Sequence, residues 1–170
     1  MLQLKSTQRL LQFCGVKPTP FPGKADDTIL GTWHANIVGF LRPRLVVFLS
    51  DRSLFCLIDI IEPTDEPIDL ATIFRKNLLR ALRENKVSQG QMDLVFQEYN
   101  EAIVTKTDSR KVLGNLNDIF NRIYFYVEDA VEQNLRIDLR QLEHEVNLMP
   151  QRNINWQYSR DVFKQILGTS

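Results

Sequence analysis

A chain of 170 residues with 44% hydrophobic and 25% charged residues has the size and composition of one globular domain. Its 21 basic and 21 acidic residues leave a formal net charge of zero. This balance removes the simplest argument for a nucleic-acid or membrane-surface protein, although a local basic patch stays open. Because no apolar run reaches the roughly 18 residues of a membrane span and no signal peptide is recognisable, we expect a reduced, cytoplasmic protein with no membrane contact.

The chain opens with a predicted strand, helix and loop. Residues 1–6 alternate enough for a strand, and the helix that follows is expected to end at Gly15. Residues 16–27 hold three prolines and a glycine, which indicates a loop. The spacing of Cys14 and Cys56 matches no metal or redox motif.

Three strand-like runs follow at 32–40, 44–50 and 53–61. Short turns that contain Pro43 and Asp51 join them. We therefore expect an antiparallel meander, with the middle run buried because it is apolar on both faces. Within the first run Trp33 and His34 must face opposite sides, and Trp33 is the expected core residue.

Helical periodicity dominates the second half of the chain, with one strand predicted at 101–107. The expected helices cover 68–85, 88–100, a long segment that includes 115–131, then 139–147 and 159–167. The predicted class is α+β: an antiparallel β-meander sheet packed with several α-helices in a single domain. Within it we expect an α+β core at 1–135 and a helical C-terminal extension, 136–170, packed on that core.

No established catalytic motif is present, so enzymatic activity is uncertain and we lean against it. A basic stripe, Lys76, Arg80 and Arg83, is interpreted as the solvated side of a helix. His144 stands between two glutamates, but adjacent helical positions point about 100° apart and cannot converge on one ion. A solvated helix face is again the favoured interpretation.

The most specific polar stretch is 104–118, VTKTDSRKVLGNLND. Thr107, Asp108 or Ser109 can cap the long helix by accepting from its first N–H groups. The helix either starts at Ser109 and carries Gly114 inside it, or starts at Asn115 after a break. Basic side chains crowd the same end, against the helix macrodipole, and with unpaired N–H groups they would make an anion site. They are Lys106, Arg110 and Lys111. The residues alone favour capping over a site.

Two segments, 31–55 and 105–118, resemble signature stretches of a family of small bacterial proteins classed as a domain of unknown function. The family patterns that these segments resemble are Trp-x-Ala-Asn, Asp-Arg-[Ser/Thr]-Leu and Thr-x-x-x-Arg-x-Val-Leu-Gly-x-x-Asn-Asp, with Thr107 here one position closer to Arg110. The likeness covers roughly residues 1–130. The chain departs from the family pattern at four positions: Ser50, Lys111, Asn115 and Leu116. The resemblance implies no activity. With it, the two interpretations of the 105–118 cluster, a structural helix cap and a functional site, are equally supported.

Two hypotheses follow. The favoured one is a non-catalytic binding or interaction domain without cofactor or metal. Its partner is unknown and is either a protein or a phosphate-bearing ligand. The start of the long helix would contact an anion or a nucleic acid. The alternative is a metal-assisted hydrolase or nuclease that uses Asp51 and Asp118. The candidate cluster contains Trp33, Asn36, Asp51, Arg52, Lys106, Thr107, Asp108, Arg110, Asn117 and Asp118.

Overall fold

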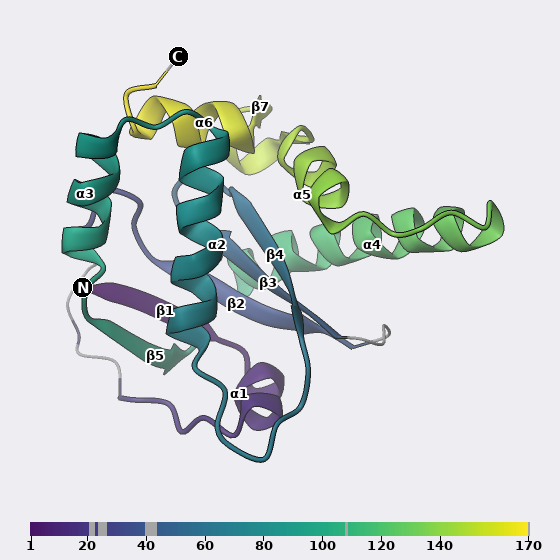
Figure 1. Cartoon of the computed structure of the whole chain (residues 1–170), viewed down its shortest axis with the longest axis horizontal. Coiled ribbons are helices and arrows are strands. Elements are labelled where there is room, and N and C mark those ends of the chain that lie inside the picture. Colours follow the sequence, from purple (N-terminus) through teal and green to yellow (C-terminus); the bar gives the residue numbers. More distant parts are fainter. Residues whose placement is uncertain (21–22, 24–26, 40–43, 108, 170) are drawn as a thin grey trace.

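A five-stranded sheet with helices on both faces organises the chain in the computed structural model (Figure 1). The structure describes residues 1–20, 23, 27–39, 44–107 and 109–169. The predicted turn at Pro43, part of the predicted loop 16–27 and the candidate residue Asp108 lie outside these ranges. The class α+β is confirmed.

The strands and helices follow the predicted order closely. The strands of the main sheet are β1 (Leu2–Ser6), β2 (Trp33–Val38), β3 (Arg44–Ser50), β4 (Cys56–Ile61) and β5 (Ala102–Lys106). The helices are α1 (Gln8–Cys14), α2 (Leu70–Glu84), α3 (Gln89–Glu98), α4 (Arg110–Glu132), α5 (Leu139–Asn147) and α6 (Ser159–Ile166). Near the C-terminus, β6 (Pro150–Gln151) pairs with β7 (Gln157–Tyr158) on either side of the short 3₁₀ helix η1 (Arg152–Ile154).

The sheet is mixed, so the prediction of a purely antiparallel sheet is wrong in part. Strands β2, β3 and β4 form the expected antiparallel meander, with β3 in the middle of the three. Strand β1, however, lies parallel to both β2 and β5, which gives the order β4-β3-β2-β1-β5. The physical reason is connectivity: the crossover from β1 to β2, which includes α1, brings the chain back to the end of the sheet where β1 began, so the two strands run parallel.

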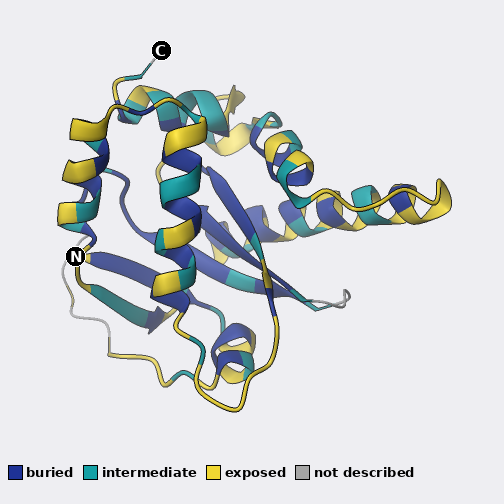
Figure 2. Ribbon diagram, in the orientation of Figure 1, coloured by how far each residue is buried: buried dark blue, intermediate teal, exposed yellow. Residues whose placement is uncertain are grey.

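Two hydrophobic clusters lie on opposite faces of the sheet. One packs alternate strand residues, among them Trp33 and Phe48, against α1, α2, α3 and α6. The other packs the intervening residues, among them Val47 and Leu49, against α4 and α5. Val46 and Phe48 are fully buried, as expected for a strand covered on both sides. Figure 2 shows the strands of the meander as the most continuously buried part of the chain.

Helix α5 covers the free edge of β4 with polar side chains. Asn147 accepts from the backbone N–H of Cys56 (2.7 Å) and donates to its carbonyl (2.8 Å). Glu143 accepts from the N–H of Ile58 (2.7 Å), and Arg140 donates to the Ile58 carbonyl (2.6 Å). Side chains thus take the place of a neighbouring strand, which leaves less of this edge open to another chain.

A buried ion-pair network fixes the same helix. Glu143 is only 4% exposed and pairs with Arg80 (2.8 Å) and Arg140 (3.1 Å). The prediction of a solvated face therefore holds for the exposed His144 but is wrong for Glu143 and for Arg80. Burial raises the pKa of Glu143, and its pairing with Arg80 acts against that shift without cancelling it. Burial lowers the pKa of Arg80, but pairing with Glu143 and Glu84 outweighs it, so that pKa is raised.

Both cysteines, Cys14 and Cys56, are buried and unbonded to each other, and burial raises the pKa of Cys14 to about 12. Within the described ranges, none of the helices has the length and apolar character needed to span a bilayer. The second half of α4 and the segment that returns to α5 extend beyond the sheet (Figure 1). The division into a core, 1–135, and an extension, 136–170, stays a prediction. Two residues of the extension are part of the hydrophobic clusters: Phe163 belongs to the first and Leu142 to the second.

Candidate functional site

A cavity of about 300 Å³ lies where the start of α4 meets the sheet and the turn between β3 and β4. Its lining comes from β1, β2, that turn, the first turns of α4 and the segment around η1. The lining residues are Lys5, His34, Asp51, Arg52, Leu54, Ser109, Lys111, Val112, Asn115, Asn153 and Ile154.

The sheet register places Lys5 and His34 side by side. They are direct partners in the parallel pair β1–β2, so their side chains emerge on the same face, which is the face that α4 covers. His34 is 3% exposed, and its Nδ1 lies 3.1 Å from the Thr107 hydroxyl at the end of β5. Trp33 points to the opposite face and is fully buried in the core there, as predicted.

The turn between β3 and β4 presents Asp51 and Arg52 to the cavity. The buried Ser50 hydroxyl organises this turn by accepting from the N–H groups of Arg52 (3.3 Å) and Ser53 (3.1 Å). Arg52 also donates to the carbonyl of Ile29 (3.1 Å). Gly31 has a φ of +71°, and a Cβ there would lie 2.7 Å from Arg52 Nε and 2.8 Å from Asp51 Oδ1. A glycine is therefore required for this close approach.

Helix α4 begins at Arg110 with Ser109 as its cap, and the Ser109 hydroxyl accepts from the N–H of Val112 (3.3 Å). Gly114 lies inside the helix, so the first of the two predicted starts is correct. No acidic residue stands in the first turn, whereas Lys111 does and lines the cavity. The positive end of a 23-residue helix is thus joined by a positive side chain rather than neutralised by a carboxylate.

Asn115 supplies a hydrogen-bond donor without a partner in the wall of the cavity. The residue is 8% exposed and its Oδ1 accepts from Asn153 Nδ2 at 2.6 Å. Its Nδ2 is buried and finds no acceptor among the described residues. A buried polar group that lacks a partner costs about 1–3 kcal/mol, so such groups commonly mark a place where a ligand or an ordered water completes the bonding.

The charges around the cavity favour an anion. Three basic side chains, Lys5, Arg52 and Lys111, line it against the single carboxylate of Asp51. Because the helix N-terminus adds partial positive charge, the balance stays positive even with the buried His34 neutral. Oxyanions bind through such cations together with N–H donors.

The structure brings together only part of the predicted cluster. Asp51 and Arg52 line the cavity, and Thr107 reaches it through its contact with His34. Asn36 accepts from the Thr7 hydroxyl at 2.6 Å and does not line the cavity. The remaining described residues of the cluster, Lys106, Arg110, Asn117 and Asp118, are exposed and lie outside the lining.

The pairing of Asp51 with Asp118 that the metal-assisted alternative needs finds no support in the geometry. Asp51 lines the cavity, whereas Asp118 lies on the exposed side of α4. Among the residues that the structure describes, no group of three or more His, Cys, Asp and Glu side chains is placed to hold a metal ion.

Sequence reasoning missed Lys5, Asn115 and Asn153. Lys5 looks like an ordinary strand residue until the register with His34 is known, and Asn153 is far from the cluster in sequence. Asn115 did carry a signal, because it stands inside the polar stretch and departs from the family pattern. A helical projection that starts at Ser109 places it on the same side as Val112 and Leu116, facing the sheet.

Fold and site together define the class of protein: an α+β domain with a polar, positively charged cavity beside its mixed sheet. The family described as Domain of unknown function (DUF6933) matches residues 3–162, and the chain belongs to this family. The expected membership in a family of unknown function is thereby confirmed, and the match extends into the C-terminal segment that supplies Asn153. No curated protein and no solved structure matches the chain.

Proposed function

We propose that this protein is a non-catalytic binding domain that takes a phosphate-bearing ligand in the cavity at the start of α4. The observation that carries the proposal is the Asn115 Nδ2 donor, buried and unpartnered among the described residues in the wall of a positively charged cavity. Ionised phosphate oxygens accept hydrogen bonds and carry negative charge, so they complement the amide donor as well as the Lys5, Arg52 and Lys111 cations.

The size of the cavity favours a small ligand over a nucleic-acid strand. About 300 Å³ is at the lower end of the volumes that bind small molecules. A nucleic-acid groove would instead need basic side chains spread along a surface, to follow successive phosphates. Here the three cations line one cavity, and the carboxylate of Asp51 lies among them, so they do not form a continuous basic surface.

The proposal is tested by titrating phosphate at fixed ionic strength while following the melting temperature. A ligand that binds the folded chain alone stabilises it by about 1.4 kcal/mol at ten times its dissociation constant. We expect phosphate to raise the melting temperature of the wild type in a saturable way. Chloride at the same ionic strength should give no comparable rise.

Two neighbouring residues provide a matched pair of variants. Lys111→Gln removes a charge that lines the cavity, whereas Arg110→Gln removes the same charge one residue earlier, where the side chain is exposed and outside the lining. The phosphate effect should persist in Arg110→Gln and be smaller in Lys111→Gln. Equal responses from the two variants would contradict the proposed site. A steep loss of oligonucleotide binding with salt, together with no phosphate effect, would point to nucleic acid instead.

A further inference from the structure

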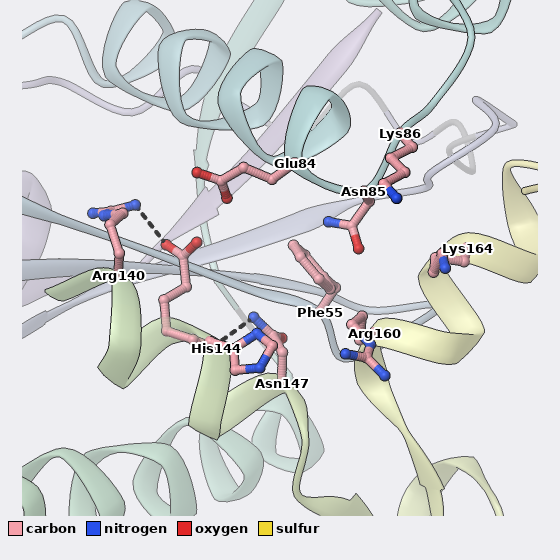
Figure 3. Close-up of a pocket in the computed structure, with 10 residues that line it drawn as sticks. Phe55, Glu84, Asn85, Lys86, Arg140, His144, Asn147, Arg160 and Lys164 are labelled. Atoms are coloured by element: carbon pink, nitrogen blue, oxygen red, sulfur yellow. Dashed lines mark hydrogen bonds and ion pairs between the residues drawn. The ribbon is translucent and has the colours of Figure 1, made fainter. Parts of the chain in front are cut away.

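A second cavity, separate from the first, lies between the end of α2, helix α5 and helix α6. Its volume is about 330 Å³. Figure 3 shows basic side chains from three different segments arranged around it: Lys86 after α2, His144 on α5, and Arg160 and Lys164 on α6. No residue is shared between the linings of the two cavities.

The carboxylates in this lining are already neutralised. Glu143 pairs with Arg80 and Arg140, and Glu84 pairs with Arg80 at 2.7 Å. Arg80 itself stands outside the lining, so it balances these carboxylates without occupying the cavity. The guanidinium of Arg80, outside the lining, thus balances the negative charge of both carboxylates.

Positive charge is left over on the opposite side. Neither Lys86 nor Lys164 forms an ion pair with a carboxylate in the described part of the chain. Among the described residues, the ion pair of Arg160 is with its neighbour Asp161, at 3.4 Å, which is a weak geometry for a charged hydrogen bond. The exposed His144 adds an imidazole ring that can donate a hydrogen bond into the cavity.

Ring stacking and hydrogen bonds hold the residues beneath these cations in place. Phe55 stacks on Phe163 with ring centroids 4.1 Å apart and an interplanar angle of 15°. Asn147 is held by both backbone groups of Cys56, and Glu143 by the N–H of Ile58. Flexible lysines over a fixed floor can close on a ligand at little cost to the fold, since only rim side chains lose freedom.

We infer that this cavity is a second binding site, for a small organic oxyanion that bears phosphate or carboxylate groups. Lys86 and Lys164 contact its charged end, and Arg160 and His144 supply further donors. The ligand must be small because the cavity between α2, α5 and α6 holds only about 330 Å³.

The test is an NMR titration of the full chain with inorganic phosphate, and in a second arm with malonate, at constant ionic strength. The His144 ring signals and the backbone signals of Lys86 and Lys164 should shift along a saturable curve. Tighter phosphate binding identifies a phosphate ligand, and tighter malonate binding identifies a carboxylate ligand. Shifts that grow linearly without saturation in both arms would overturn the inference.

Matched double variants complete the experiment. Lys86→Gln with Lys164→Gln should weaken the tighter of the two anions at least about tenfold, which corresponds to a 1.4 kcal/mol loss. Lys17→Gln with Arg83→Gln removes the same total charge from residues outside the lining and should leave binding unchanged. Equal affinities in the two double variants would overturn the inference. Saturable shifts confined to the region of Lys111 and Asn115 would also overturn the inference, while supporting the first site. Saturable shifts confined to the region of Lys86, His144 and Lys164 would support the inference and count against the first site.

Discussion

The side chain of Asn147 on α5 pairs with the backbone of Cys56 on β4 through two hydrogen bonds, of 2.7 and 2.8 Å, in the way a neighbouring strand would. Both residues are buried, at 3% and 0% exposure. The C-terminal segment is therefore joined to the sheet by directional polar contacts as well as by apolar packing. This attachment also positions the segment that carries Asn153 into the first cavity.

Asn147→Ala should destabilise the protein by at least about 2 kcal/mol, because the N–H and C=O of Cys56 would both lose a buried partner at about 1–3 kcal/mol each. Gln133→Ala is the control: this exposed side-chain amide donates to Asp129, one turn earlier on α4, at 2.7 Å, and its loss should cost within about 0.5 kcal/mol. Urea unfolding of both variants measures the difference. Similar free energies of unfolding would contradict a stabilising role for the two Asn147–Cys56 hydrogen bonds.

The pH dependence of stability should reveal the buried carboxyl of Glu143. Its pKa is raised above the ordinary 4.5, chiefly by burial, so the folded chain binds this proton more readily than the unfolded chain. Its contribution is therefore fully present below about pH 4.5 and is lost as the pH rises through the folded pKa. We expect the free energy of unfolding of the wild type, relative to Glu143→Gln, to fall over this interval. A relative stability that is flat, or that rises with pH, would mean that pairing with Arg80 dominates burial.

Two glycines should respond to alanine in opposite directions. At Gly31 a Cβ would lie within 3 Å of Arg52 and Asp51, and the positive φ adds about 1–2 kcal/mol of strain. At Gly114, inside α4, a Cβ meets nothing within 4 Å, and alanine should stabilise the helix by about 0.5–1 kcal/mol. Thermal unfolding of both variants gives the sign of each change, and destabilisation by Gly114→Ala would contradict the continuous helix.

Local patterns predicted the elements well because their causes are local. The apolar run at 44–50 is a buried strand, and the periodicity after Ser109 is one long helix with Ser109 as its cap. The parallel placement of β1 was not predictable in the same way, since it depends on which strands meet after the chain has crossed the sheet. Short-range sequence patterns do not indicate which strands become neighbours in the sheet.

The candidate site was predicted only in part for the same reason. Asp51 and Arg52 were identified through the Asp-Arg-[Ser/Thr]-Leu pattern of the family, whereas Lys5 and Asn153 join them only in the folded chain. Arg110 was one of the basic residues expected at this end of the helix, yet it is exposed and outside the lining, which Lys111 joins instead. One residue along a helix changes the direction of a side chain by about 100°.

The central claim, that the cavity at the start of α4 binds a phosphate-bearing ligand, is tested most directly at the side-chain amide of Asn115. Its NH₂ resonance can be assigned by its disappearance in Asn115→Asp and followed while phosphate is added at constant ionic strength. Because Nδ2 has no acceptor within the described chain, a bound phosphate oxygen should shift the resonance downfield along a saturable curve with the same midpoint as the melting-temperature rise. An amide signal that stays in place while phosphate saturates the protein would contradict the account.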